Sequence, residues 1–495
     1  MSTNDEKANT VDEVSKVDTT LPEDPDAHLS PEDQKKRERA LLWKIDLYLV
    51  PWLCLLYLVS FLDRTNIGNA RIMGLAEDTG ITPGQYNLAL AIFFISYSLF
   101  EPPSNVLLKK LKPRYWISFI VIMFGLCCMC IGFVRNFSGL VATRWFLGMF
   151  EAGLFPGCQF YLSCWYKRSE FGVRSAIFFS AAAVAGSFGG LLAAAIGNMD
   201  GVGGYPGWSW IFILEGLFTI MIGFASFWMV RDFPDEAKFL TEEERLRVYY
   251  RLKADQQASA DHETFKWSAV KAALTDWKTY TSMSMFMGNG CSLYAVSLSL
   301  PTIVRQLGYT ATTAQLLTVP PYAVAAVVTV VMSAIADRTR QRGLCTIATS
   351  GVGIIGFILL MSPVSTGVRY FALYLAAAAI YPCVPLTISW VANNTNGTFK
   401  RGIVMGIVIG WSNMQGVVGS NVYQSRDAPR FLPGHGICMG FLAVFLFGGA
   451  IVHRTLLVRE NKARLNGERD HLLHGKSESE IALMGDKRPD YIYML

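Results

Sequence analysis

The feature that most constrains this chain is a series of long apolar segments separated by short polar ones. A helix needs roughly 20 mostly apolar residues to cross a membrane. Only 17% of the residues are charged and the mean hydropathy is +0.31, whereas soluble domains carry about 25% charged residues. We therefore predict an all-α polytopic membrane protein with twelve transmembrane helices, at 45–70, 86–108, 115–134, 139–164, 174–197, 208–230, 279–304, 313–336, 344–363, 369–392, 402–424 and 434–457.

The remaining composition excludes several other classes of protein. The net charge of +5 is mild and no dense basic tract is present, so nucleic acid is not an expected partner. The six histidines form no HxxxH pattern, and no GxxxxGK[ST] loop exists, which argues against a membrane-bound enzyme and an ATP-driven pump. The ten cysteines all lie in apolar segments without a histidine cluster, so we expect neither a metal site nor a cofactor.

Polar stretches divide the chain into parts. The segment 231–278 separates two six-helix halves, 41–230 and 279–457. Residues 1–40 lack the apolar core of a signal peptide, and we expect a disordered cytosolic tail there. Residues 458–495 form a second cytosolic tail in this scheme.

Small residues recur in the fifth helix of each half. The stretch 180–190 reads SAAAVAGSFGG, and Gly402, Gly406 and Gly410 repeat every four residues. Small residues let membrane helices approach closely. Their matching positions indicate that the halves are structural repeats that can rock against each other around a shared site.

Orientation follows from the short loops, because Lys and Arg are concentrated on the cytosolic side of a membrane protein. About six basic residues lie in one set of loops: Arg71, Arg135, Arg305, Arg369, Arg426 and Arg430. About twelve lie in the other set: Lys109, Lys110, Lys112, Arg114, Lys167, Arg168, Arg174, Arg338, Arg340, Arg342, Lys400 and Arg401. The richer side predicts cytosolic termini and a cytosolic central segment.

Ionisable residues inside the spans are costly in a membrane and usually functional. Away from the ends of the spans there are six charged residues, all in the first half: Asp63, Arg64, Glu101, Arg144, Glu151 and Glu215. At 1.5 Å per residue, Asp63 and Arg144 share one level, and Glu151 lies two turns deeper on the Arg144 face. Arg grips a carboxylate with two parallel hydrogen bonds, and a desolvated carboxyl group can take up and release a proton. The pattern predicts an anion–proton symporter.

A structural interpretation stays open for several of these residues. Asp63 and Arg144 could pair only to hold two helices together, and Glu101, near the cytosolic end of its span, fits a structural role better. Glu215 is evenly balanced between the two interpretations. In the second half aromatic and amide groups replace the charges, which favours substrate recognition shared between the halves, and our candidates there are Tyr294, Trp390, Asn393 and Asn413.

Several motifs together resemble the fungal anion:cation symporters, the allantoate permease group of the major facilitator superfamily. The resemblance covers roughly residues 41–457, and any one motif alone would be weak. The motifs are FLDRTNIGNA at 61–70, RWFLGMFEAGLFPG at 144–157, FPDEA at 233–237, TEEER at 241–245, WVANN at 390–394 with Lys400-Arg401, and DAPR at 427–430 before Gly434-His435-Gly436.

This resemblance implies alternating access and proton-driven import of a small organic anion, such as allantoate, nicotinate or pantothenate, by a monomer in the plasma membrane. It also implies that Asp63 and Glu151 couple protons and that Arg64 and Arg144 bind the substrate. A nutrient-sensing receptor and an organic-anion exchanger without proton coupling remain alternatives.

One departure concerns the inner gate. The superfamily's Gly-x-x-x-Asp-Arg loop keeps Asp337-Arg338 in the second half, whereas the first-half loop, 108–114, has no acidic residue. We therefore expect Asp337 and Arg338 to act in gating, with Glu101 as the replacement in the first half.

Overall fold

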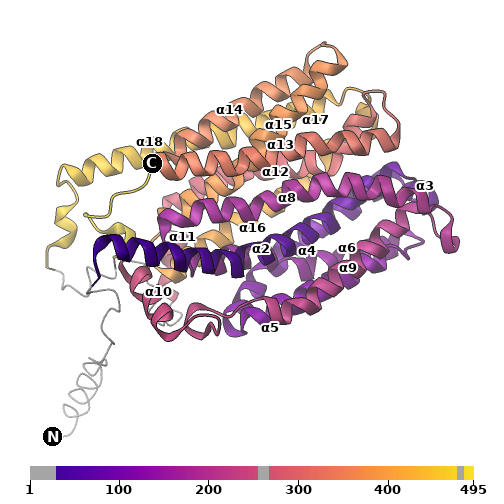
Figure 1. Ribbon diagram of the computed structural model, residues 1–495. Coiled ribbons are helices and arrows are strands. Elements are labelled where there is room, and N and C mark those ends of the chain that lie inside the picture. Colours follow the sequence, from indigo (N-terminus) through magenta and orange to yellow (C-terminus); the bar gives the residue numbers. More distant parts are fainter. Residues whose placement is uncertain (1–28, 255–266, 476–483) are drawn as a thin grey trace, which may run out of the picture.

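Long helices run side by side along the whole molecule in the computed structural model (Figure 1). The structure describes residues 29–254, 267–475 and 484–495, and within these ranges it contains helices and no strand. An apolar run of this length satisfies its own backbone hydrogen bonds only as a helix in a membrane, which is why the sequence folds into this arrangement.

The first half contains six spans, of which the fourth is divided in two. Its helices are α2 (Pro31–Ile72), α4 (Pro83–Lys110), α5 (Pro113–Ile131), α6 (Phe137–Glu151) with α7 (Leu154–Ser163), α8 (Arg168–Ile196) and α9 (Gly207–Met229). A short α3 (Leu75–Asp78) lies between α2 and α4. Every predicted span of this half corresponds to one of these helices or to the α6–α7 pair.

The second half repeats the pattern. Its helices are α12 (Trp277–Arg305), α13 (Ala311–Thr339), α14 (Arg342–Met361), α15 (Thr366–Asn393) and α16 (Thr398–Val422), and the sixth span comprises α17 (Leu432–Phe441), the π-helical turn η6 (Leu442–Gly448) and α18 (Gly449–Leu465). Each of the twelve predicted spans thus corresponds to a helix or to a divided helix, six before and six after the central segment.

Not every span is equally apolar. By length and composition alone, nine helices in the described part of the chain qualify as membrane-crossing. The other three spans are the divided α6–α7 pair and the more polar α4 and α12. Polar side chains are tolerated in a membrane helix that faces other helices, and α4 and α12 both line the seam between the halves.

The first helix begins earlier than the sequence indicated. We expected a disordered tail through residue 40, but α2 starts at Pro31 and continues without a break into the first span. The Ser30 side chain accepts a hydrogen bond from the backbone of Asp33 (3.2 Å), and Pro31 occupies the first turn. This is a standard helix start, and it makes residues 31–40 part of α2.

One end of the bundle carries the start of α2, the helices α10 (Glu242–Ala254) and α11 (Trp267–Leu274), and the C terminus, while α3 lies at the opposite end (Figure 1). We call these the inner and outer ends. Ion pairs join α2 to its neighbours at the inner end, Lys44 to Glu244 (2.7 Å) and Glu38 to Lys167 (2.6 Å). A capping box opens α10, because the Glu244 carboxylate accepts a hydrogen bond from the backbone N–H of Thr241 (2.9 Å).

The C-terminal segment 484–495 packs against the inner end of the second half. Asp486 is buried and contacts Lys278 (2.6 Å) on α12 and Lys400 (2.7 Å) on α16. We call these two lysines the lysine pair. Tyr493 exchanges backbone hydrogen bonds with the side chain of Asn461 on α18, both 2.9 Å. The segment therefore ties three helices of one half together.

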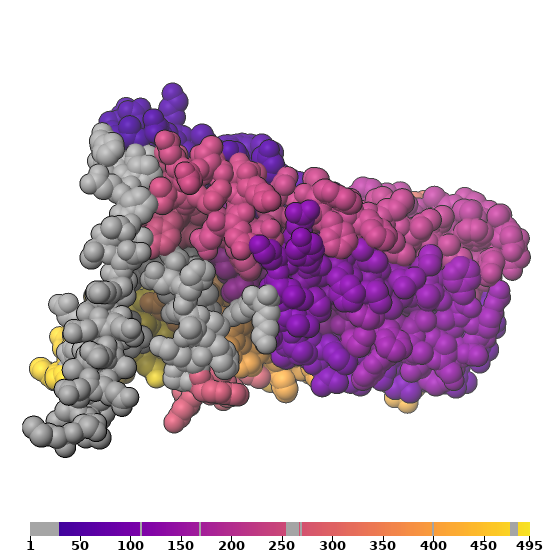
Figure 2. Space-filling model, turned by 90° about the horizontal axis from the view of Figure 1, so that it is seen from below, coloured from indigo at the N-terminus to yellow at the C-terminus, as the bar shows by residue number. Residues whose placement is uncertain are grey.

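The two halves meet along two main contacts, α8 against α13 and α4 against α16, with α2 beside α12 between them. Gly190 of α8 lies so close to α13 that a Cβ atom there would be 2.5 Å from the backbone oxygen of Gln315. The predicted small-residue stretch in the fifth helix is thus a contact between the halves. Seen from below, indigo-to-magenta residues of the first half form most of the surface (Figure 2).

Candidate substrate and proton site

A chain of buried polar side chains crosses the seam between the halves. Glu151 on α6 accepts hydrogen bonds from Arg64 on α2 through Nη2 (2.5 Å) and Nε (3.1 Å). Arg64 Nη1 donates to the hydroxyl of Tyr294 on α12 (3.3 Å). The Tyr294 hydroxyl donates to Asn413 on α16, and the Asn413 amide donates to Glu101 on α4 (2.9 Å). One guanidinium thus lies between two carboxyl groups, and each half supplies part of the chain.

Arg64 is held by aromatic rings as well as by Glu151. Its guanidinium carbon lies 5.0 Å from the ring centre of Tyr97 and 5.4 Å from that of Phe93, both on α4. Cation–π contacts of this kind attract a guanidinium without neutralising its charge. Arg64 is only 3% exposed, so an anion that reached it would meet a desolvated cation, where an ion pair is strong.

Glu151 has spare capacity for a proton. Its Oε1 accepts both bonds from Arg64 and one from Ser60 (2.6 Å), whereas the buried Oε2 has no hydrogen-bond partner among the described residues. A buried carboxyl oxygen without a partner calls for an explanation beyond packing.

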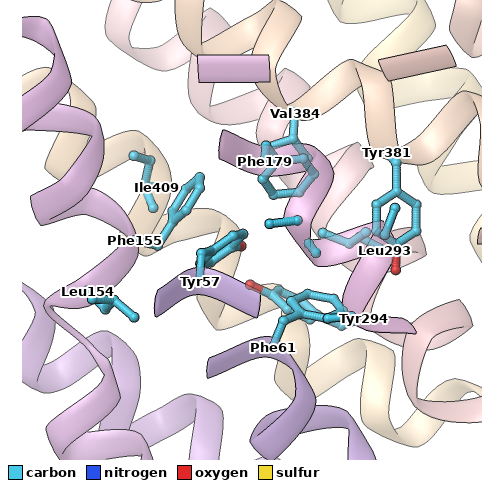
Figure 3. Packing of buried hydrophobic residues seen from close by; sticks show 14 of the residues in the cluster. Tyr57, Phe61, Leu154, Phe155, Phe179, Leu293, Tyr294, Tyr381, Val384 and Ile409 are labelled. Carbon is cyan, nitrogen blue, oxygen red and sulfur yellow. The ribbon is translucent and has the colours of Figure 1, made fainter. Parts of the chain in front are cut away.

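A small cavity of about 20 Å³ opens beside Arg64 and Tyr294. Apolar and aromatic side chains from both halves point toward it, among them Tyr57, Phe179 and Val384 (Figure 3). A space this small holds a single water molecule, so the halves are closed around the site. A molecule larger than water would enter only when the halves separate.

A second group of buried polar residues lies beside this chain in the first half. Asn66 on α2 donates to Glu215 on α9, and Asn69 donates to Asn66 (3.4 Å). Asp63 is fully buried near Glu215, and its polar neighbours include the thiol of Cys128 and the hydroxyl of Thr219. A buried carboxyl group with only neutral donors beside it calls for an explanation beyond packing, so this group is a second candidate for proton binding.

The ion pairs differ from the structural interpretation. Arg144 and Glu151 are both buried on α6. However, no ion pair joins Asp63 to Arg144 among the described residues, and the ion-pair partner of Glu151 is Arg64. Arg144 instead donates to the backbone oxygen of Arg64 (3.5 Å), and its Nε and Nη2 make no hydrogen bond within the described ranges. Helix spacing orders residues along one helix, whereas these contacts depend on how α2 and α6 cross.

The second-half candidates separate into two places. Tyr294 and Asn413 belong to the buried chain. Trp390 and Asn393 lie at the inner end of α15, where Trp390 Nε1 donates to the backbone oxygen of Met494 (2.9 Å) and Asn393 Nδ2 contacts the Met494 sulfur (3.2 Å). The structure therefore brings these two residues to the C-terminal segment and not to the cavity.

The gating candidates also differ in position. The Asp337 carboxylate on α13 accepts a bond from the backbone of Val173 on α8 (2.8 Å), which joins the halves at the inner end, and it also pairs with Arg342. Arg338 is exposed nearby. Glu101 is not at the inner mouth, because its bond to Asn413 places it in the buried chain.

Sequence reasoning missed Ser60, Phe93 and Tyr97. A signal for the last two was present, because Phe93, Tyr97 and Glu101 are spaced four residues apart and so share one face of α4. An aromatic face that ends in a buried acid is a pattern that marks a cation site.

Comparisons with known proteins agree with this architecture. Residues 53–420 match the model of the Major Facilitator Superfamily. The chain is 38% identical to the MFS-type transporter cnsO of Penicillium expansum, over 92% of this chain and 90% of that protein. It is 32% identical to the high-affinity nicotinic acid transporter of Saccharomyces cerevisiae, over 94% and 86% of the two chains.

Among solved structures, a bacterial homologue of the human lysosomal transporter Spinster, in an inward-facing and unoccupied conformation, aligns with a TM-score of 0.60. It is 16% identical and covers 82% of this chain and 95% of its own, which supports the fold alone. The family match and the curated relatives define the class of protein as a multi-pass membrane transporter and not an enzyme. The chain belongs to the major facilitator superfamily.

Proposed function

We propose that this transporter imports a small organic anion together with a proton. The observation that carries the proposal is the pair of Arg64 and Glu151, buried at the seam and joined by a 2.5 Å contact. A buried ion pair is weak evidence for stability, because desolvation offsets most of the attraction. Its position beside a small, closed cavity that residues of both halves line fits a working site better.

The mechanism uses competition for Arg64. An incoming carboxylate takes guanidinium hydrogen bonds that Glu151 Oε1 accepts in the unloaded protein. Glu151 then binds a proton, since a buried carboxylate without a counter-ion favours its neutral form. Anion and proton therefore help each other to bind, which is the thermodynamic requirement of symport. Tyr294 and Asn413 extend the same hydrogen-bond chain into the second half, so occupancy of Arg64 is linked to the seam.

Asp63 and Glu215 are two further candidate proton-binding residues in this proposal. Both are buried, and the hydrogen-bond donors beside each of them are neutral. Asp63 serves as a second proton site, close to the route of the anion, and Arg144 stabilises negative charge between the outer end and Arg64.

The substrate class is a monocarboxylate with a compact apolar or ring body. Two independent supports are the apolar lining of the cavity and the relative named as a nicotinic acid transporter. The sequence motifs that resemble allantoate permeases favour the same class. We further propose that the protein monomer lies in the plasma membrane with its inner end in the cytosol, because the Lys- and Arg-rich loops lie at that end.

Uptake by intact cells tests the proposal. Cells that express the chain are given labelled nicotinate, pantothenate, allantoate or biotin at external pH values of about 5 and 7, with nicotinamide as the neutral match to nicotinate. We expect accumulation of at least one carboxylate, faster at the lower pH, and none of nicotinamide. Equal uptake of the acid and its amide would contradict anion selectivity, and uptake independent of pH would favour exchange without protons.

A further inference from the structure

A second cavity, of about 310 Å³, lies at the outer end of the seam. It is far larger than the central one and falls at the lower end of the usual size of ligand pockets, about 300–1,000 Å³. Both halves line it: Arg71, Ile72, Ala76, Glu77, Pro83 and Tyr86 from the first, and Thr302, Arg305, Gln306 and Ser425 from the second. We call it the outer vestibule.

Two arginines of the vestibule close the seam from opposite sides. Arg71, at the end of α2, donates from Nη2 to the hydroxyl of Ser425 in the second half (2.8 Å). Arg305, at the end of α12, donates from Nη1 to the backbone oxygen of Ile72 in the first half (3.3 Å). Both bonds go to neutral acceptors, and a carboxylate is a stronger acceptor for a guanidinium than either. An anion in the vestibule would therefore compete for both.

The electrostatic balance of the vestibule favours an anion. Glu77 is the one acidic residue in its lining, against Arg71 and Arg305. Pro83 belongs to the first turn of α4, which contains no acidic residue. The positive end of that helix dipole therefore adds to the arginines. Arg71 is also fixed in place, because its guanidinium carbon lies 4.6 Å from the ring centre of Tyr86.

The vestibule leads toward the buried site by a line of arginines. Tyr86, beneath Arg71, is 2% exposed and donates to the backbone oxygen of Ile67 (3.0 Å). Arg144 lies within electrostatic range of Tyr86 on the inner side and contacts the backbone of Arg64 (3.5 Å). Arg71, Arg144 and Arg64 thus follow one another from the outer end to the cavity, all in the first half, and Tyr86 separates the first from the second.

We propose that the outer vestibule is a capture site for the carboxylate, and that its two ligands, Arg71 and Arg305, are also the latch of the outer seam. The inference rests on the proposed function, since it takes the substrate to be an organic anion. A carboxylate that binds both guanidinium groups removes the bonds to Ser425 and Ile72. Arrival of the substrate is then coupled to opening of the outer end, and the anion moves past Tyr86 to Arg144 and Arg64.

A protection experiment tests binding in the vestibule without requiring transport. Ala76→Cys places a thiol in the lining, and cells are labelled with a membrane-impermeant maleimide, with the unsubstituted chain as background. Millimolar nicotinate or benzoate should slow labelling several-fold, nicotinamide should not, and added salt should reduce the protection. Arg71→Gln and Arg305→Gln should each raise the carboxylate concentration needed for half-maximal protection about fivefold. Arg135→Gln is the matched control, since Arg135 stacks on the ring of Tyr205 (5.3 Å) much as Arg71 does on Tyr86. Arg135 lies outside the vestibule, so its replacement should leave protection unchanged.

Transport gives the second measurement. Arg71→Gln and Arg305→Gln should raise KM for the accumulated carboxylate about fivefold each without lowering the maximal rate, since exposed charges contribute modestly. Without ligand, Ala76→Cys should be labelled at the parent rate in Arg135→Gln and at least as fast in Arg71→Gln and Arg305→Gln, because each of these two removes one bond of the latch. The inference is overturned if no carboxylate protects Ala76→Cys, or if Arg135→Gln loses as much protection as Arg71→Gln. Protection without uptake of any carboxylate would uphold the vestibule and overturn the proposed function instead.

Discussion

Replacement of Glu151 by Gln is expected to strengthen anion binding while it abolishes concentrative uptake. In the unsubstituted protein Arg64 donates two hydrogen bonds to one oxygen of Glu151, at 2.5 and 3.1 Å. A hydrogen bond to a charged group contributes about 1.5–3 kcal/mol, and a bound anion must displace at least one of them. At 1.4 kcal/mol per factor of ten, removal of the competing charge tightens anion binding by about 10- to 150-fold. The neutral amide cannot take up the coupling proton.

Purified protein in reconstituted vesicles separates these two effects. Counterflow, the exchange of labelled for unlabelled anion, needs no proton and should persist in Glu151→Gln, whereas uptake driven by a pH gradient should fall to the level of empty vesicles. Glu101→Gln is the matched control for affinity, because Glu101 is equally buried in the same chain but bonds to Asn413 and not to Arg64. Weaker anion binding by Glu151→Gln, or gradient-driven uptake equal to that of the wild type, would refute the competition mechanism.

Three further predictions concern the anion site, the seam and the inner end. Arg64→Lys keeps the charge but loses the planar fork, so uptake per surface molecule should fall by about tenfold or more. Gly190→Ala puts a methyl group 2.5 Å from the backbone oxygen of Gln315, and this crowding should slow transport at least about fivefold while the protein still reaches the cell surface. Asp276 caps the start of α12 and contacts both Lys278 (3.0 Å) and Lys400 (2.7 Å). Burial acts to raise the pKa of Asp276, but the two lysines outweigh burial and hold the pKa below its usual range. Limited proteolysis at the start of α12 should therefore be constant between about pH 5 and 8 and increase only below about pH 4, whereas Asp486→Asn should loosen the C-terminal segment at neutral pH because it removes that segment's contacts with the lysine pair.

The spans were predictable because membrane insertion depends on a property that the sequence displays directly, the length of each apolar run. Their ends were predictable to a few residues where Pro, Gly or a capping residue marks them, as Thr82-Pro83 does for α4. The polar start of α2 was missed because hydropathy detects helices that cross a membrane and does not detect polar helices that lie in water. The signal was the helix start at Ser30-Pro31.

The sequence predicted most residues of the buried site, but it did not predict which of these residues contact each other. Ionisable residues in apolar spans are conspicuous, and Arg64, Glu151 and Glu101 were all selected for that reason. Which of them touch depends on how helices far apart in the sequence cross, and spacing along one helix does not contain that information. Trp390 and Asn393 show the same limit, since they resemble binding residues in composition but contact Met494, about a hundred residues away.

The central claim is that anion and proton move together through the site of Arg64 and Glu151. The most direct test is to load reconstituted vesicles with a pH-sensitive dye and add the carboxylate that wild-type cells accumulate, with the membrane potential clamped. The account predicts that adding the anion acidifies the lumen, and that this acidification disappears in Glu151→Gln while counterflow continues. Anion entry without any change in luminal pH in the wild-type protein would contradict the account.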